Sequence, residues 1–188
     1  GDIIEAQHAI FFEKGFKRIS PHTAVSVSTH SASGIISCKF DLRGPNTTIA
    51  AGCNSGLDAA YLAFNAIRLG DADVMIVGAA EAPITPFCYA IFCASGNLSR
   101  ENSYPQKAVK PYDVNADGMV LGEGGGIVIL EELQHALKRN AKIYGEVLGY
   151  SALNEAFDLF GVGTENGAMA YNFRQALTNA NLDLTDID

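Results

Sequence analysis

Apolar and polar positions along this chain follow two different periods, and these periods predict where helices and strands lie. Residues 3–13 repeat apolar side chains at a spacing closer to 3.6 than to 2, and Gly15 follows them, which predicts a helix ending there. Residues 54–69 show the same period and are closed by Gly70. The helical period therefore dominates much of the first part of the chain.

Short apolar runs between polar segments predict strands. Residues 74–77 and 127–130 are continuous apolar runs, which is typical of strands buried on both faces. Residues 47–51 predict a strand just before the helix at 54–69, and residues 143–150 predict another strand with a glycine inside it. The segments at 47–51, 54–69 and 74–77 therefore predict a strand, helix, strand unit.

Five further segments have residue patterns that predict a helix, a loop or the approach to a strand. Residues 133–139 predict a short helix, and residues 23–39 are ambiguous but compatible with one closely packed, buried helix. Residues 98–112 contain two prolines among polar residues and predict a loop, while 182–187 resemble the lead-in to a further strand. Residues 166–179 predict an amphipathic helix. Its expected apolar face comprises Ala170, Phe173, Ala176 and Leu177.

Composition narrows the class of protein. The chain has 188 residues, 48% of them hydrophobic, enough for the core of one ordinary domain. Its net charge of −8 offers no basic field for a nucleic acid or an anionic membrane, and its apolar stretches are interrupted before about 18 residues. The chain shows no secretory signal pattern, so a cytoplasmic location is expected.

The cysteines and histidines suggest neither a disulfide framework nor a metal site. The cysteines at 38, 53, 88 and 93 are irregularly spaced, which favours reduced thiols, and the last two are too far apart for a zinc motif. The histidines at 8, 22, 30 and 135 are scattered and have no evident acidic partner in the sequence. We expect no metal and no cofactor.

Cys53 is the most informative residue, because a β-type run breaks at Gly52 and a helical run begins at once. The first N–H groups of a helix are unpaired and carry the positive end of its dipole, which favours the thiolate, the nucleophilic form of cysteine. Gly52 permits a tight turn, and Ser55 and Gly56 leave room for a substrate carbonyl. A buried structural cysteine remains the alternative interpretation.

Two other glycine-containing motifs are weaker. Residues 113–118 match the first half of an EF-hand loop, but Gly124 occupies the twelfth position, where a bidentate Glu is required, so a polar turn is favoured over a calcium site. Residues 122–126 suggest a nucleotide loop, but they lead into a strand rather than a helix. The glycines there more simply permit close backbone packing.

Several stretches together resemble one family. They are residues 51–56 (AGCNSG), 70–81 (GDADVMIVGAAE), 42–45 (LRGP), 110–113 (KPYD), 117–124 (DGMVLGEG) and 130–133 (LEEL). In order and spacing they resemble the β-ketoacyl-acyl-carrier-protein synthases over nearly the whole chain. The resemblance implies a thiolase-like layered α/β fold (α-β-α-β-α), of which residues 1–188 would be a partial domain containing the N-terminal half and central part.

The resemblance also implies a reaction and its partners. Cys53 would accept an acyl group from acyl carrier protein, and the carbanion from decarboxylated malonyl-carrier protein would attack it to give a β-ketoacyl thioester. The Cys53 N–H would donate to the oxyanion. The family works as a homodimer, to which residues 74–79 would contribute a strand. The histidines and the lysine of its catalytic machinery match no residue here, so the chain alone is expected to be inactive in condensation.

Residue by residue, the resemblance assigns further roles. Thr23 and Phe92 would line the acyl pocket, and Lys17 and Arg18 would receive the acidic carrier protein. The sequence departs from the family at Gly52, at Thr23 and at Gly96. Gly52 stands where the family usually has alanine or a similar small residue before the nucleophile. Thr23 stands where a bulky apolar pocket residue is common, and Gly96 stands where a carrier-binding arginine can occur. Acyl length and carrier affinity are left open.

Two rival classes share the fold. A thiolase also places a cysteine at a helix start but uses coenzyme A, and it usually has a long loop domain in a region that is short here. A chain-length-factor-like partner lacks the thiol that Cys53 provides. Both rivals are therefore less favoured than the synthase.

Overall fold

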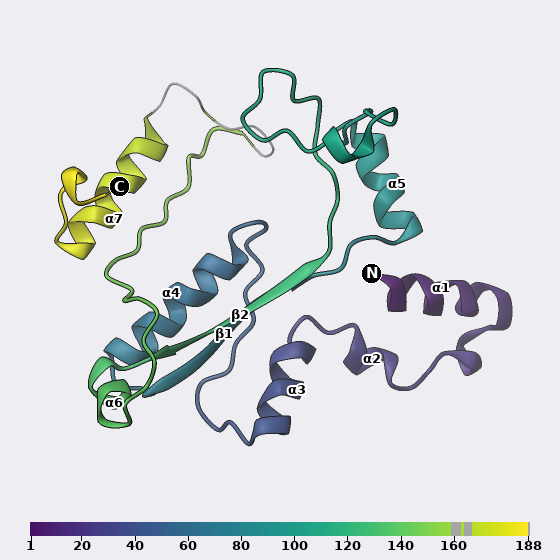
Figure 1. Ribbon diagram of the computed structural model, residues 1–188. Helices are drawn as coiled ribbons and strands as arrows, with labels where there is room; N and C mark the ends of the chain where they lie inside the picture. Colours follow the sequence, from purple (N-terminus) through teal and green to yellow (C-terminus); the bar gives the residue numbers. More distant parts are fainter. Residues whose placement is uncertain (159–162, 164–166, 188) are drawn as a thin grey trace. The chain divides into compact units, whose positions relative to one another are not determined.

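The computed structural model describes residues 1–158, 163 and 167–187 (Figure 1). The chain divides into two compact units, Gly1–Leu130 and Glu131–Asp188. The first unit contains α1 (Asp2–Lys14), η1 (Phe16–Arg18), α2 (Thr23–Ser26), α3 (Ser31–Phe40), α4 (Ser55–Arg68), β1 (Val74–Glu81), α5 (Pro86–Ser95), η2 (Pro105–Lys107) and β2 (Gly124–Glu131), whose last residue begins the second unit. The second contains α6 (Leu133–Lys138), α7 (Ala168–Ala180) and η3 (Leu184–Asp186). That the chain forms one partial domain stays a prediction.

The helix expected at 3–13 is confirmed as α1. Asp2 and Glu5 lie in its first turn and Lys14 in its last, where each charge complements the helix dipole. Gly15 ends the helix with φ +75, and its N–H donates to the carbonyl of Phe11 at 2.9 Å. A residue with a side chain rarely adopts this conformation, so the glycine explains why the helix stops.

A helix packed on a two-stranded sheet forms the core of the first unit. α4 packs against β1, and Ala63 and Val77 are buried with 3% and 6% of their surfaces exposed. A Cβ on Gly56 would lie 3.1 Å from the Cβ of Ala79, so the glycine brings α4 close to the strand. The helix expected at 54–69 and the strand expected at 74–77 are both confirmed.

The register of the sheet follows from its glycines. A Cβ on Gly78 would meet Ile127, and a Cβ on Gly125 would meet Ala80, so β1 and β2 run antiparallel. Ile127 and Ile129 are each 63% exposed. The expectation of fully buried strands at 74–77 and 127–130 is therefore wrong for this structure, because the described part of the sheet has two strands and α4 packs on one of its faces.

Two expected strands do not form. Residues 47–50 and 143–150 have no regular secondary structure, and Ala51 joins only an isolated bridge with Cys53. A strand needs a neighbour to take up its N–H and C=O groups, and the described residues place no strand beside either segment. Their β-type residue patterns predicted the wrong state because pairing is not a local property.

The expectation of a single buried helix at 23–39 is also wrong. The segment is divided into α2 and α3, and no residue of either helix is buried. Between them, the Ser28 hydroxyl and the His30 Nδ1 lie 2.7 Å apart, and the Ser31 hydroxyl donates to the carbonyl of Val25. Serine side chains that bond to nearby groups compete with helical hydrogen bonds, which explains the break.

The predicted loop at 98–112 is confirmed apart from η2, and its two ends are tied together. Ser99 N–H donates to the carbonyl of Met119, and Met119 N–H donates to the carbonyl of Asn97, both at 2.9 Å. Asp117 accepts from the Ser99 hydroxyl at 2.8 Å and from the Arg100 N–H at 3.0 Å, which lowers its pKa. We call residues 97–100 and 117–119 the neck of this loop.

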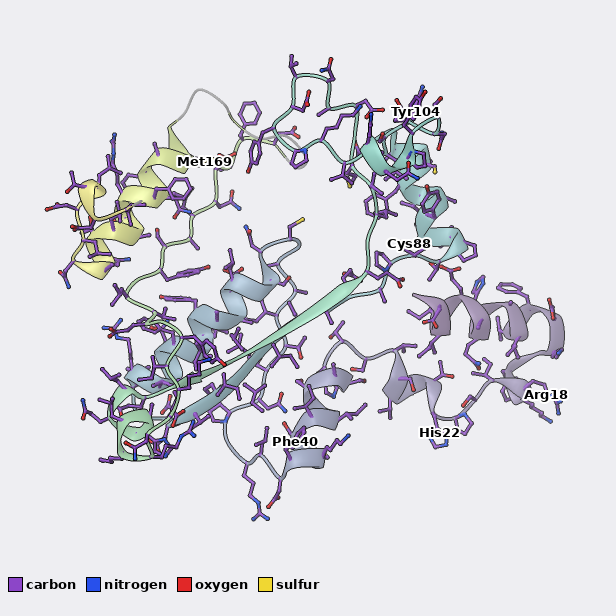
Figure 2. The ribbon with its side chains drawn as sticks, in the orientation of Figure 1. Arg18, His22, Phe40, Cys88, Tyr104 and Met169 are labelled. Atoms are coloured by element: carbon purple, nitrogen blue, oxygen red, sulfur yellow. The ribbon has the colours of Figure 1, made fainter. Side chains whose placement is uncertain are left out.

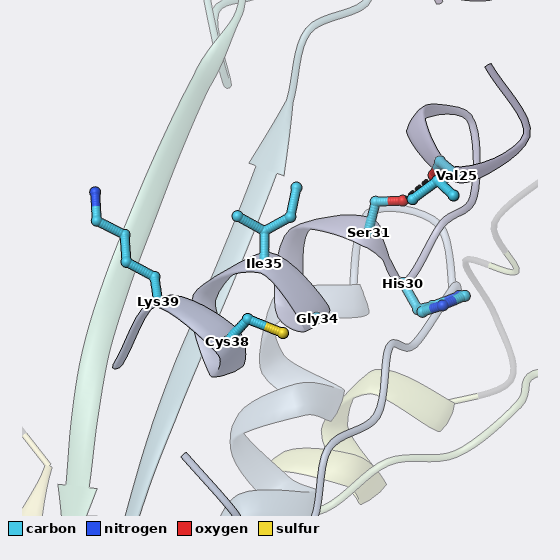
Figure 3. A pocket seen from close by; sticks show the side chains of 7 residues that line it. All are labelled: Val25, His30, Ser31, Gly34, Ile35, Cys38 and Lys39. Atoms are coloured by element: carbon cyan, nitrogen blue, oxygen red, sulfur yellow. Dashed lines mark hydrogen bonds between the residues drawn. The ribbon is translucent and has the colours of Figure 1, made fainter. Parts of the chain in front are cut away.

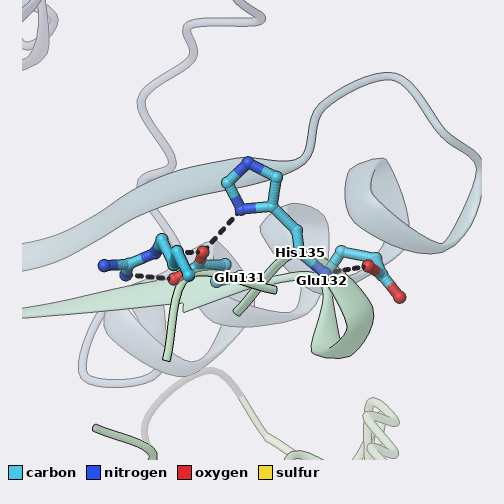
Figure 4. Close-up of polar contacts among 4 residues, drawn as sticks. Glu131, Glu132 and His135 are labelled. Atoms are coloured by element: carbon cyan, nitrogen blue, oxygen red, sulfur yellow. Dashed lines mark hydrogen bonds and ion pairs between the residues drawn. The ribbon is translucent and has the colours of Figure 1, made fainter. Parts of the chain in front are cut away.

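In the second unit, the start of α6 is held by acidic side chains (Figure 4). Glu132 accepts a hydrogen bond from the N–H of His135 at 2.6 Å and so caps the helix. Glu131 accepts two hydrogen bonds from Arg139, at 2.7 and 2.6 Å, and its Oε1 lies 2.6 Å from the Nδ1 of His135. The Arg139 and His135 contacts lower the pKa of Glu131 to about 2.

The helix expected at 166–179 is confirmed as α7, although residue 166 lies outside the described residues. On its expected apolar face, Ala176 and Leu177 are half-buried while Phe173 is 67% exposed. The Asn179 side chain donates to the carbonyl of Tyr150 at 2.8 Å, so α7 contacts the segment that precedes it. No helix among the described residues is both long and apolar enough to cross a membrane.

Candidate active site

Cys53 lies on a turn directly before α4. Gly52 adopts φ +62, and the Ser55 N–H and hydroxyl both donate to the carbonyl of Gly52, at 3.1 and 2.7 Å. The Ser55 hydroxyl also accepts from the N–H of Ala51 at 2.9 Å. Ser55 therefore fastens both sides of the turn that carries the thiol, a role the sequence did not reveal.

The helix begins slightly later than expected. Asn54 is the N-cap of α4 and the first helical residue is Ser55, so Cys53 precedes the cap by one residue. Gly56 serves the packing of α4 on Ala79 as well as keeping the first turn small. The predicted nucleophile position between a glycine turn and a helix start is thus present, with the thiol just outside the helix.

The thiol of Cys53 is free and exposed. Cys38, Cys88 and Cys93 are also free, as their irregular spacing predicted, and Cys88 is half-buried. A structural cysteine packed in a core would be inaccessible, so the buried alternative does not describe Cys53 here. The geometry leaves the sulfur open to an incoming carbonyl carbon.

Thr23 and Phe92, the expected pocket residues, lie on separate helices. Thr23 begins α2, is half-buried, and its hydroxyl lacks a hydrogen-bond partner within the described part of the chain. Phe92 lies on α5 and is half-buried. Residues 1–158, 163 and 167–187 show no hydrogen bond or ring contact that joins either side chain to Cys53. Their roles therefore stay predictions.

Lys17 and Arg18, the expected docking residues, lie on η1 immediately after α1. Both are exposed, and Figure 2 shows the labelled Arg18 side chain extending away from the ribbon. Their short 3-10 turn holds two positive charges side by side on the surface. This placement is compatible with an acidic partner and does not by itself identify one.

A separate open groove runs along α3 (Figure 3). It has a volume of about 520 Å³ and is lined by Val25, His30, Ser31, Gly34, Ile35, Cys38 and Lys39. None of the expected site residues lines it. The Nδ1 of His30, one of these lining residues, lies 2.7 Å from the hydroxyl of Ser28.

One histidine has an acidic partner that the sequence interpretation missed. Glu131 precedes His135 by four residues and lies against it, together with Arg139. The spacing of four residues was the available signal, but Glu131 lies before the helix begins, at the end of β2.

In the turn at 113–118, the Asn115 N–H donates to the Asp113 carboxylate at 2.7 Å, as a polar turn requires. No cluster of potential metal ligands is found among the residues described.

Comparisons with known proteins define the class first. A type II polyketide synthase ketosynthase, solved in complex with its acyl-carrier protein and bound to the hexaketide, matches with a TM-score of 0.88 and 36% identity. The match covers 92% of this chain and 43% of that chain. A β-ketoacyl synthase from Burkholderia phymatum matches with a TM-score of 0.88 and 27% identity, over 97% of this chain and 44% of that one. The fold is therefore the amino-terminal portion of a thiolase-like ketosynthase fold, as expected.

The sequence comparisons identify the family. The family described as "Beta-ketoacyl synthase, N-terminal domain" matches residues 4–136. The 3-oxoacyl-[acyl-carrier-protein] synthase 2 of Rhizobium meliloti is 44% identical over 94% of this chain and 42% of its own length. The enzyme of the same name from Vibrio harveyi is 38% identical over 99% of this chain and 45% of its own. The chain belongs to the β-ketoacyl synthase family and spans less than half the length of these relatives.

Proposed function

We propose that this chain forms the amino-terminal part of a β-ketoacyl-acyl-carrier-protein synthase, with Cys53 as the nucleophile that accepts the acyl group. The observation that carries the proposal is the free, exposed thiol on the Gly52 turn before α4, within the range matched by the family. Thiolases and chain-length-factor-like partners remain the rival classes, and no feature of the described residues favours either.

The proposed reaction has two steps that share one sulfur. The Cys53 thiolate attacks the carbonyl carbon of an acyl-carrier thioester, and the carrier thiol leaves with a proton. Malonyl-carrier protein then loses carbon dioxide, and its carbanion attacks the acyl-Cys53 carbonyl, releasing the thiolate and a β-ketoacyl-carrier product. Covalent catalysis divides one difficult condensation into two easier steps. The Cys53 N–H is proposed to donate to the oxyanion that forms in each step.

The same proposal assigns roles to the expected pocket and docking residues. Thr23 and Phe92 line the acyl pocket, and Lys17 and Arg18 bind an acidic acyl carrier protein. Their positions support these roles: the first two are half-buried on helices, and the last two are exposed on η1. The solved ketosynthase in complex with its acyl-carrier protein supports the choice of partner.

We further propose a homodimer in the cytoplasm. The exposed apolar side chains of the sheet support an interface, since Ile76 and Ile127 are 37% and 63% exposed. The free cysteines support a reducing compartment. A size measurement of the complete enzyme in the presence of a reductant, which prevents disulfide cross-links between the free cysteines, would test the dimer directly.

The test of the nucleophile uses the complete enzyme that contains these residues. Incubation with a labelled acyl-carrier protein should place the acyl group on Cys53, located by peptide mass, and C53S should lower acylation and condensation by at least about a thousandfold. C38S replaces another exposed cysteine and should leave both activities unchanged. Acylation at a different cysteine, or β-ketoacyl product from C53S, would contradict the proposal. Acyl transfer from coenzyme A but not from the carrier would favour the thiolase alternative.

A further inference from the structure

The entry to α5 is fastened by an acidic side chain from a distant helix. Glu5, in the first turn of α1, accepts a hydrogen bond from the Thr85 hydroxyl with Oε1 and another from the Phe87 N–H with Oε2, at 3.3 Å. Both carboxylate oxygens are therefore used on the first turn of α5. We call Glu5 and Thr85 the α5 clamp.

Thr85 is the centre of the clamp. It is the N-cap of α5, and it is 5% exposed, which makes it the buried polar residue of the described core. Its hydroxyl donates to Glu5 and accepts from the Cys88 N–H at 3.3 Å. A threonine hydroxyl has one proton to donate, so both directions of hydrogen bonding are needed to satisfy it.

Charge reinforces these contacts. A carboxylate beside the first N–H groups of a helix is stabilised by the positive end of the helix dipole. The hydrogen bond from Thr85 is the main cause of a lowered pKa at Glu5, so the acceptor stays ionised at neutral pH. The clamp therefore holds when the enzyme would be working.

A second carboxylate holds the segment that leads into α5. Glu123, just before β2, accepts a hydrogen bond from the N–H of Ile84 at 3.0 Å. The two residues are 39 positions apart in the sequence. The backbone that leads into α5 is thus held from the α1 side and from the sheet side.

The half-buried face of α5 connects the clamp to Phe92. Within α5 and its cap, Thr85 is buried and Cys88 and Phe92 are half-buried, whereas the other residues are exposed. Positions separated by three and by seven residues lie on one side of a helix. Because a helix of this length moves as a rigid element, a shift at Thr85 displaces Phe92 as well.

We propose that Glu5 and Thr85 are positioning residues that fix the orientation of α5 and, through Phe92, set which acyl chains the enzyme accepts. The second half of this proposal rests on the proposed function of Phe92 as an acyl-pocket residue. The first half concerns the position of α5 and is independent of any activity. The two halves can therefore be tested separately.

The position of α5 can be measured with two natural thiols. Cys88 takes part in the clamped turn and is half-buried, while Cys93 lies near the other end of the same helix and is exposed. In the complete enzyme, with each labelled cysteine located by peptide mass, E5A and T85V should each raise the alkylation rate of Cys88 relative to Cys93 by on the order of tenfold. T85S keeps the hydroxyl and should restore the original ratio. E13Q removes a carboxylate near the far end of α1 and should leave the ratio unchanged.

The acyl preference can be measured in the complete enzyme. E5Q and T85V should change the ratio of kcat/KM between a long and a short acyl-carrier substrate by on the order of tenfold, while the KM for malonyl-carrier protein stays constant. T85S should return the ratio to that of the unsubstituted enzyme. A general loss of folding would instead lower every substrate's kcat/KM together.

The outcomes distinguish the two proposals. An unchanged Cys88 to Cys93 ratio in E5A and T85V overturns the clamp. A changed thiol ratio with an unaltered acyl preference overturns the link to Phe92. An enzyme that fails to condense any acyl-carrier substrate overturns the proposed function and, with it, the acyl half of this inference, whereas the thiol ratio still decides whether the clamp positions α5.

Discussion

At the scale of single residues, glycine is needed where the backbone enters the left-handed region or where another chain segment comes too close. Gly52 is an example of the first case, with φ +62 and open space around the position of a Cβ. Gly118 combines both, since it has φ +147 and a Cβ there would lie 2.5 Å from the N atom of Ser99. The sequence suggested a tight turn at Gly52 but gave no sign of the contact at Gly118.

We predict that Gly52→Ala destabilises the chain by about 1–2 kcal/mol, because an alanine at positive φ strains the backbone. Gly34→Ala is the matched control, since Gly34 lies inside α3, has no positive φ and faces open space. That change should stabilise by about 0.5–1 kcal/mol, through lower entropy of the unfolded chain. Urea unfolding of both variants measures the difference. Equal effects of the two substitutions would contradict the conformational argument.

The Glu131 carboxyl predicts how stability depends on pH. Its pKa is about 2 in the folded state, against an ordinary value of 4.5, because Arg139 and His135 bond to the ionised form. Between these values the unfolded state binds more protons, so stability rises with pH across that window. The contribution of Glu131 is therefore complete above pH 4.5 and is lost as the pH falls through about 2.

This dependence can be observed as a difference between variants. The gap in urea midpoint between the unsubstituted chain and E131Q should be widest above pH 4.5 and should narrow toward pH 2. Arg139→Lys keeps a positive charge but loses the two parallel hydrogen bonds, so the pKa of Glu131 should move upward, as followed by NMR. A gap that stays constant between pH 4.5 and pH 2 would show that the ion pair does not stabilise the fold.

At the scale of elements, helices with a regular apolar period could be predicted, whereas the single helix expected at 23–39 and the strands expected at 47–51 and 143–150 were wrong. The bounds of α1 and α4 follow from apolar spacing and from Gly15 and Gly70, which act within one or two turns. Residues 47–50 and 143–150 have strand-like composition, but a ladder depends on partners elsewhere in the chain. The division of 23–39 into α2 and α3 depends on serine hydrogen bonds that the apolar pattern does not register.

Packing of α7 provides a prediction at this scale. A Cβ on Gly149 would lie 2.7 Å from the carbonyl oxygen of Ala176 and 2.8 Å from the N atom of Ala180. Gly149→Ala should therefore push α7 away from the segment at 149–150 and cost about 1–3 kcal/mol. Hydrogen exchange of the α7 amides should become faster. Gly145→Ala lies on the same segment in open space and should leave that exchange unchanged, so faster exchange in both variants would count against the packing argument.

At the scale of the whole molecule, the family could be predicted from the sequence, because six short motifs keep their order and spacing, whereas Cys53 as the nucleophile stays a prediction. The turn at Cys53 was predictable since its glycine and its helix are local neighbours. The α5 clamp was not, because Glu5 and Thr85 are 80 positions apart. The low burial of the apolar runs was also missed, since periodicity shows which side chains are suited to a core without showing what covers them.

The neck formed by residues 97–100 and 117–119 has a consequence for how this protein can vary. Because the two ends are held together by backbone bonds and by Asp117, the residues between them leave and rejoin the unit at almost one point. Tyr112 and Val114 project fully into solvent near the tip. Doubling the length of such an excursion costs only about 0.6 kcal/mol of closure entropy. An affinity tag introduced at this exposed tip should therefore cost the fold little stability.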